Sequence, residues 1–258
     1  MPRLLELGGR RVPFLRWSFV RMLLGMKRLT TEWQVGDGRE QALAEHVLAS
    51  ARRDDLDAAI RVVDEFCYEQ SFMINVGDEK GEILDSAIRR VAPQGLLELG
   101  TYCGYSALRT ARMMPNGAHL TSLEFNADNA EIARQILEHA GVADRVTVVH
   151  GIIGDGGTTI AALESEHGFA PESVDFVFLD HAKEAYLPDL KQIVDAGWLH
   201  SGSVVVADNV KFPGVPEYRE FMHEHEGREW RTVEHETHVE YQSVIKDLVL
   251  ESEYVGAA

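Results

Sequence analysis

Short apolar runs alternate with helix-length segments through the middle of the chain, and this alternation constrains the fold more than any other feature. The runs lie at 96–99, 119–125, 145–150, 174–179 and 203–207. This is the pattern of parallel strands joined by crossover helices. Two further stretches, around 229–234 and 244–254, are typical of an antiparallel pair at one edge. The sequence therefore predicts an α/β fold with a doubly wound, seven-stranded, mostly parallel sheet that has an antiparallel edge strand.

Helical spacing of apolar residues precedes the first strand. It predicts helices near 39–51 and 54–69, and a third that starts after Asp78 as N-cap and ends before Pro93. No linker or repeat divides the 258 residues. We therefore expect one domain over residues 37–258, preceded by an extension over residues 1–36.

The N-terminal extension is basic although the chain as a whole is acidic. Over residues 1–28 its cations outnumber the single acid, Glu6, and an apolar run over 14–26 lies among them. Arg16 and Arg21 interrupt this run, so it does not predict a membrane-spanning helix. The alternatives are a weak contact of residues 10–28 with an anionic membrane surface, and packing on the acidic body or on a second subunit. Packing is the default.

The net charge and the cysteines limit the partners and the compartment. A formal charge of −17 would repel the phosphates of a nucleic acid over most of the surface. Cys67 and Cys103 form neither a disulfide framework nor a zinc pattern. We expect no nucleic-acid partner and a reducing, cytoplasmic location, with peripheral membrane contact as an alternative.

The turn after the first strand has the features of a nucleoside site. It reads Glu98-Leu-Gly-Thr-Tyr-Cys-Gly-Tyr-Ser106, and glycine lets a ligand approach the backbone closely. Glu124 ends the second strand, where an acid can accept hydrogen bonds from both ribose hydroxyls. Tyr102 occupies the middle of what would be a dinucleotide glycine motif and would crowd a pyrophosphate. The pattern favours S-adenosylmethionine over NAD, although a purely structural turn would look similar.

Acidic residues end the fourth and fifth strands. Asp180 follows Leu179, and Asp208-Asn209 follows Ala207. The carboxyl ends of neighbouring parallel strands face one crevice, where two carboxylates and an amide suit Mg²⁺. The alternative is that Asp180 and Asp208 cap the helices that follow them.

Motifs from five regions, in order, resemble catechol O-methyltransferase over residues 37–255. They are the run Asn75 to Asp78, the stretch 97–111, Asp180-His-x-Lys183 with Tyr186 to Asp189, Ala207 to Val210 with Pro213-Gly214, and Glu240-Tyr241. The resemblance implies S-adenosylmethionine and Mg²⁺ as cofactors and a catechol as small-molecule substrate.

The resemblance also implies roles for individual residues. Asp180, Asp208 and Asn209 fall on the metal ligands, Lys183 on the general base, and Glu240 on the acid that binds the second substrate hydroxyl. Asn209 is also expected at the reacting centre. The cofactor is expected to contact ten residues: Val76, Glu98, Gly100, Tyr102, Ser106, Glu124, Phe125, Ile153, Asp180 and His181.

The sequence departs from the usual catechol O-methyltransferase pattern at three places that bear on the substrate and the cofactor. Ala182 and Phe72 stand where the family commonly has Trp, and Ile153-Gly154 replaces a Ser-Gln pair. We expect a wider, less aromatic substrate pocket and altered contacts with adenine. A caffeoyl-thioester or a natural-product phenol is an alternative substrate. The alternative from another class of function is a protein without catalytic activity, either a cofactor-binding protein or a membrane-associated adaptor.

Histidine pairs and Cys103 could also carry chemistry, but structural roles explain them better. His223-x-His225 and His235-x-x-His238 have metal-like spacing, but we interpret them as surface histidines because they lie among glutamates. Cys103 is interpreted as a packed residue of the turn.

Overall fold

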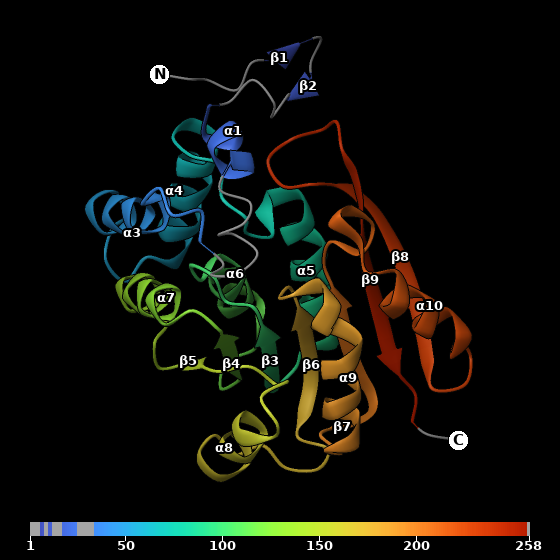
Figure 1. Cartoon of the computed structure of the whole chain (residues 1–258). Coiled ribbons are helices and arrows are strands. Elements are labelled where there is room, and N and C mark those ends of the chain that lie inside the picture. The colour runs from blue at the N-terminus through green and yellow to red at the C-terminus, as the bar shows by residue number, and fades with distance from the viewer. Residues whose placement is uncertain (1–5, 8–9, 12–16, 25–33, 257–258) are drawn as a thin grey trace.

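A seven-stranded sheet forms the centre of the protein in the computed structural model, which describes residues 6–7, 10–11, 17–24 and 34–256 (Figure 1). The strand order is β5-β4-β3-β6-β7-β9-β8, and the pairs from β5 to β7 are parallel. β9 pairs antiparallel with both β7 and β8. The predicted sheet is confirmed, with the strand of opposite direction placed one position in from the edge.

The elements follow the predicted alternation from the first strand of the sheet onwards. The strands are β3 Gly95–Leu99, β4 His119–Glu124, β5 Val146–His150, β6 Val174–Leu179, β7 Leu199–Ala207, β8 Trp230–His238 and β9 Lys246–Tyr254. The connecting helices are α6 Tyr105–Met113, α7 Ala127–His139, α8 Thr158–Glu166, α9 Tyr186–Asp195 and α10 Pro216–Glu224, with short helical turns at Lys183–Ala185 and Val210–Gly214. The helices before the sheet are α3 Arg39–Ser50, α4 Leu56–Glu69 and α5 Gly77–Val91.

Helices cover both faces of the sheet because its strands are apolar on both sides. Leu96, Phe176 and Phe178 face one core, which also contains residues of α3 to α7. Leu97, Leu99 and the alternate residues of the other strands face a second core with α8, α9 and α10. Figure 1 shows α9 in front of β6 and β7.

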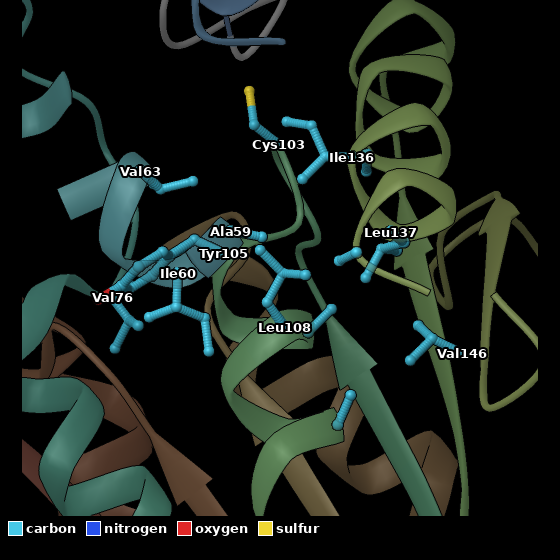
Figure 2. Close-up of a cluster of buried hydrophobic side chains, with 14 of the residues drawn as sticks. Ala59, Ile60, Val63, Val76, Cys103, Tyr105, Leu108, Ile136, Leu137 and Val146 are labelled. Atoms are coloured by element: carbon cyan, nitrogen blue, oxygen red, sulfur yellow. The ribbon is translucent and has the colours of Figure 1, made fainter. Parts of the chain in front are cut away.

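The first core is built where α4, α6 and α7 meet the sheet. Figure 2 shows Ala59 and Ile60 of α4 beside Tyr105 and Leu108 of α6, with side chains of α7 and β5 continuing the cluster. Cys103 is buried at the end of this cluster. The packing holds the turn between β3 and α6 in place.

The start of α5 differs from the expectation. Asp78 was expected as the N-cap, but the helix begins at Gly77, whose N–H donates to the Asn75 side chain over 3.1 Å. Asp78 accepts one hydrogen bond from the Tyr68 hydroxyl and another from the Glu79 N–H. The N-cap is Val76, which provides no side-chain cap, and the Asn75 side chain binds the first N–H of the helix.

The N-terminal segment is described only in part. The short strands β1 Glu6–Leu7 and β2 Arg10–Arg11 pair with each other, and α1 spans Trp17–Leu24. Residues 14–16 and 25–26 of the apolar run lie outside the described residues. Buried Arg39 donates to the backbone carbonyls of Ser18 and Phe72, which ties α1 to the loop before α5. Among the helices that the structure describes, none is long and apolar enough to cross a membrane.

Candidate active site

The turn between β3 and α6 passes very close to the end of β6. Gly100 has a φ of 99°, and a Cβ there would lie 2.3 Å from the carbonyl oxygen of Asp180. Only glycine fits this position without displacing the backbone. Tyr102 also has a positive φ, of 48°, which is uncommon for a bulky residue. Its hydroxyl donates to Glu40 of α3 over 2.8 Å, and this bond helps to hold the turn.

Glu124 lies beside this turn, as the sequence predicts. One carboxylate oxygen accepts from the backbone N–H of Tyr102 at 2.7 Å, and the other accepts from that of Asn126 at 2.8 Å. Burial raises the pKa of Glu124 to about 7, although these hydrogen bonds oppose the shift. Each oxygen has further acceptor capacity, so the carboxylate can also bind ligand hydroxyls.

Glu98 is fully buried beneath the same turn. One oxygen accepts from the Ser122 hydroxyl at 2.6 Å, whereas Oε2 has no hydrogen-bond partner. Burial raises the pKa of Glu98 to about 7, and hydrogen bonds from Ser122 and Ser106 oppose this. An unpartnered oxygen in a fully buried carboxyl group indicates a place for a donor that a ligand would supply.

The remaining residues predicted to bind a cofactor differ in burial and in contacts. Val76 is buried just before α5, and Ile153 is buried in the second core. Phe125 follows Glu124 and is 49% exposed, so its ring is available to a ligand. The His181 ring stacks on Tyr186 with centroids 4.9 Å apart, and its Nε2 donates to Asp189 Oδ2 at 3.1 Å.

Lys183 is held at the end of β6 rather than in solvent. Its Nζ donates to Asp180 Oδ1 at 3.0 Å and to the Tyr186 hydroxyl at 2.7 Å. That hydroxyl lies within hydrogen-bond distance of the carbonyl oxygens of Leu179 and Asp208. Ala182, which precedes Lys183, offers only a methyl group at this point of the site. The ammonium is therefore fixed between the ends of β6 and β7.

Asn209 is oriented by a set of buried acceptors. Its Nδ2 donates to Glu240 Oε1 and to Asp247 Oδ2, both at 3.1 Å. Its own backbone N–H donates to Asp208 Oδ1 at 2.7 Å, in a residue with a φ of 57°. Because both donors face acidic groups, the amide oxygen is directed away from them and is free to act as a ligand.

Asp180 and Asp208 do not cap helices. The turns that follow them have no side-chain cap. Asp208 Oδ2 is buried without a hydrogen bond, although Lys80 Nζ lies 2.8 Å away as an ion pair. Burial raises the pKa of Asp208 to about 8, against the effect of Lys80, and raises that of Asp180, against the effect of Lys183. Added positive charge would stabilise both carboxylates in their ionised form.

Two residues among the contacts of Asp208, Asn209 and Glu240 were not predicted from the sequence. Lys80 of α5 contacts Asp208, Glu240 and Asp247 with a side chain that has no exposed surface. Burial alone would lower the pKa of Lys80, but the three carboxylates raise it above its usual range. A lysine in the first turns of an amphipathic helix carries no sequence signal of burial. Asp247, at the start of β9, gives only the weak signal of an acid beside an apolar strand.

The other candidate residues have ordinary partners. His223 contacts Glu234, His235 contacts Glu251, and His238 contacts Glu79. Burial raises the pKa of Cys103 well above its usual value, which disfavours a thiolate. Within the part of the chain that the structure describes, no three His, Cys, Asp or Glu side chains are grouped to hold a metal ion. The set Asp180, Asp208 and Asn209 has two such residues and an amide.

Comparison with known proteins identifies the family. The family described as O-methyltransferase matches residues 53–237. The chain belongs to the O-methyltransferase family. A probable O-methyltransferase of Mycobacterium tuberculosis is 56% identical over 235 residues, which cover 91% of this chain and all of that protein. Catechol O-methyltransferase B of Danio rerio is 45% identical over 203 residues, covering 79% of this chain and 74% of the relative.

Solved structures share the fold of this O-methyltransferase. An O-methyltransferase from Streptomyces achromogenes, determined in complex with S-adenosylmethionine, superposes with a TM-score of 0.60 at 20% identity. The match covers 94% of this chain and all of that chain. The predicted enzyme class and the resemblance to catechol O-methyltransferases are thus confirmed.

The raised pKa values predict how stability depends on pH. Glu98 and Glu124 titrate near 7 when folded and near 4.3 when unfolded, so the folded protein binds more protons between these values. The ligand-free protein should lose stability as pH rises from about 5 through 7. Thermal unfolding across pH 5–8 measures this. The Glu98→Gln variant, which cannot titrate at this position, should show a shallower loss, and an equally steep loss would contradict the assignment.

Proposed function

We propose that this O-methyltransferase transfers the methyl group of S-adenosylmethionine to one hydroxyl of a catechol that is chelated by Mg²⁺. The observation that best supports the proposal is that the five residues predicted for this chemistry are connected by contacts. These residues are Asp180, Lys183, Asp208, Asn209 and Glu240. Lys183 contacts Asp180 and, through the Tyr186 hydroxyl, the backbone carbonyl of Asp208. Asn209 contacts Asp208 and Glu240, and Lys80 joins the same two carboxylates. Similarity to catechol O-methyltransferases of vertebrates supports the same substrate class.

The turn after β3 would hold S-adenosylmethionine. Gly100 lets the turn lie directly against the end of β6, where a Cβ would clash with the Asp180 carbonyl, and Glu124 would accept from the ribose hydroxyls. The unpartnered Oε2 of Glu98 suits a cationic donor such as the amino group of the cofactor. Phe125 and His181 offer rings at the border of the site. The complex of the Streptomyces relative with S-adenosylmethionine supports this cofactor.

Asp180, Asp208 and Asn209 would hold Mg²⁺. Two carboxylates and one amide oxygen are hard ligands, and Asp208 Oδ2, which pairs with Lys80 but accepts no hydrogen bond, fits that role. When bound, the cation would lower the pKa of a chelated hydroxyl and fix its oxygen. Lys80 and Lys183 lie against the same carboxylates, so those oxygens must be shared or released when a cation binds.

Lys183 would act as the general base. The Tyr186 hydroxyl and Asp180 fix its ammonium at the site, and in its neutral form Nζ can accept the proton of a substrate hydroxyl. Glu240 would accept a hydrogen bond from the second hydroxyl, since its Oε1 already faces Asn209 and Lys80. Orientation by these groups would bring the reacting oxygen in line with the methyl group.

A pair of substrates tests the proposal directly. We expect a catechol to be methylated in the presence of Mg²⁺, and the matched phenol with a single hydroxyl to react at least about 100-fold more slowly, because it cannot chelate. Methyl transfer from labelled S-adenosylmethionine measures both rates. Equal kcat/KM for the two compounds would show that the enzyme does not use a vicinal diol. Larger phenols in the same assay test whether Ala182 and Phe72 widen the pocket.

Glu124 tests the placement of the cofactor. Glu124→Ala should weaken S-adenosylmethionine by about 1.5–3 kcal/mol, because hydrogen bonds to a charged acceptor are lost. Calorimetry on the folded variant measures the affinity. Glu166→Ala removes an exposed carboxylate at the end of α8 and should leave the affinity unchanged. If both variants bind like the wild type, the ribose does not contact Glu124.

A further inference from the structure

Lys80 is a buried cation that the proposed reaction does not use. Its Nζ lies 2.8 Å from Asp208 Oδ2 and 3.3 Å from Asp247 Oδ2, and it also contacts Glu240 Oε1. The side chain has no exposed surface. It comes from α5, whereas its three partners follow β7, follow β8 and begin β9. One ammonium thus joins three parts of the chain at the end of the sheet.

Glu240 is enclosed on the side of α5 as well. A Cβ on Gly77 would lie 3.3 Å from the Glu240 Cβ, so the backbone at the start of α5 packs directly against this residue. Asn209 Nδ2 approaches the same carboxylate oxygen that Lys80 contacts. The position of the Glu240 carboxylate therefore depends on Lys80 and Asn209 together.

Asp247 links Lys80 to the backbone after β7. Its Oδ1 accepts from the N–H groups of Phe212 at 2.9 Å and Lys211 at 3.2 Å. Its Oδ2 accepts from Asn209 and contacts Lys80. Buried carboxylates of this kind repel one another unless a cation lies between them. Lys80 supplies that cation in the structure.

The charges of these side chains do not balance without a metal ion. With every group ionised, the ion pairs of Asp180, Asp208, Glu240 and Asp247 within the described part of the chain are with the ammoniums of Lys80 and Lys183. Two negative charges remain, and one divalent cation would neutralise them. Lys80 and such a cation would both be drawn to Asp208 Oδ2, and like charges a few ångströms apart in a buried site repel strongly.

We propose that Lys80 is a built-in counter-cation that keeps the carboxylates of the site together without metal and thereby limits how tightly the site binds Mg²⁺. Lys80 is a positioning residue, because it acts through Asp208, Glu240 and Asp247. The inference rests on the proposed Mg²⁺ site. It gives the residue two opposite effects: it stabilises the metal-free protein, and it weakens the binding of the metal.

The test uses Lys80→Met, which keeps the length of the side chain and removes its charge. Calorimetric titration of the full chain with MgCl₂ alone, without cofactor or substrate, measures the affinity for the metal. We expect Mg²⁺ to bind the variant about tenfold more tightly or better, because one repelling charge is gone. Thermal unfolding should show a lower Tm without metal and a larger rise with saturating Mg²⁺ than in the wild type.

Lys246→Met is the matched control. It removes the same charge next to Asp247 but from an exposed side chain, and its affinity for Mg²⁺ should stay within about twofold of the wild type. If Lys80→Met does not fold, Lys80→Gln makes the same test, since its amide can still donate to the carboxylates.

The outcomes separate this inference from the proposed function. Weaker or unchanged Mg²⁺ binding in the Lys80 variant, with a wild type that binds, would overturn the role of Lys80 and leave the metal site intact. A packing role alone would lower the Tm equally with and without Mg²⁺, which also overturns the inference. A wild type that does not bind Mg²⁺ under any of these conditions would overturn the metal site itself.

Discussion

Lys183→Ala should lower kcat by about 10²–10⁴-fold, the usual contribution of a positioned general base. The ammonium contacts Asp180 and Tyr186 at the end of β6, and its loss removes the only group that the proposal assigns as the base. Affinity for S-adenosylmethionine should change little, because Glu124 and the turn after β3 are untouched. Steady-state kinetics and calorimetry on the same preparation separate the two quantities.

Two further lysine variants sharpen this prediction. Lys183→Arg should not restore the rate, because a guanidinium stays protonated and cannot accept the proton. Lys191→Ala, on α9, removes a lysine whose ammonium lies over the Phe221 ring and should keep the wild-type kcat. Turnover in Lys183→Ala equal to that of the wild type would remove Lys183 from the mechanism.

Removal of divalent cations should have a second large effect. Treatment with EDTA should reduce methyl transfer by about 10²–10³-fold, and added Mg²⁺ should restore it, since a Lewis acid supplies several kcal/mol to such a reaction. Binding of S-adenosylmethionine should persist in EDTA. Two of its expected contacts, Glu124 and Glu98, lie on β4 and β3 rather than at the end of β7.

The Asp208→Asn variant tests whether the dependence of the reaction on Mg²⁺ arises from binding at Asp208. The variant keeps the shape of the side chain and one oxygen but loses the buried charge, so it should need much more Mg²⁺ for half-maximal activity. Asp195→Asn, at the exposed end of α9, removes a charge outside the cluster and should respond to Mg²⁺ like the wild type. Full turnover of a catechol in EDTA would contradict the metal assignment for the enzyme as a whole.

The strands of the sheet could be predicted because their pattern is local. Each buried strand needs a short apolar run, and each crossover needs a helix-length segment, so runs such as 96–99 and 174–179 fall within β3 and β6. The order of strands then brings Gly100, Glu124 and Asp180 to neighbouring carboxyl ends. Those residues were predicted because their place on the strands alone puts them together.

The N-cap of α5 and the burial of Lys80 could not be predicted in this way. Asp78 has a residue type suited to capping, but Asn75 reaches the free N–H first. Lys80 has the sequence context of an exposed lysine on a helix, and solvation is the usual state of that side chain. Its burial depends on Glu240 and Asp247, which lie 160 and 167 residues further along the chain.

The sequence by itself therefore determined the strands of the sheet, its two covered faces and the candidate residues at the strand ends, because hydrophobic periodicity is fixed by near neighbours in the chain. Only the tertiary structure decided how the charges of the site are balanced. The free energy of a buried charge depends on the groups that surround it in space, and these come from α5, β7, β9 and the loop after β8. No local pattern places an ammonium from one of these elements among carboxylates from the other three.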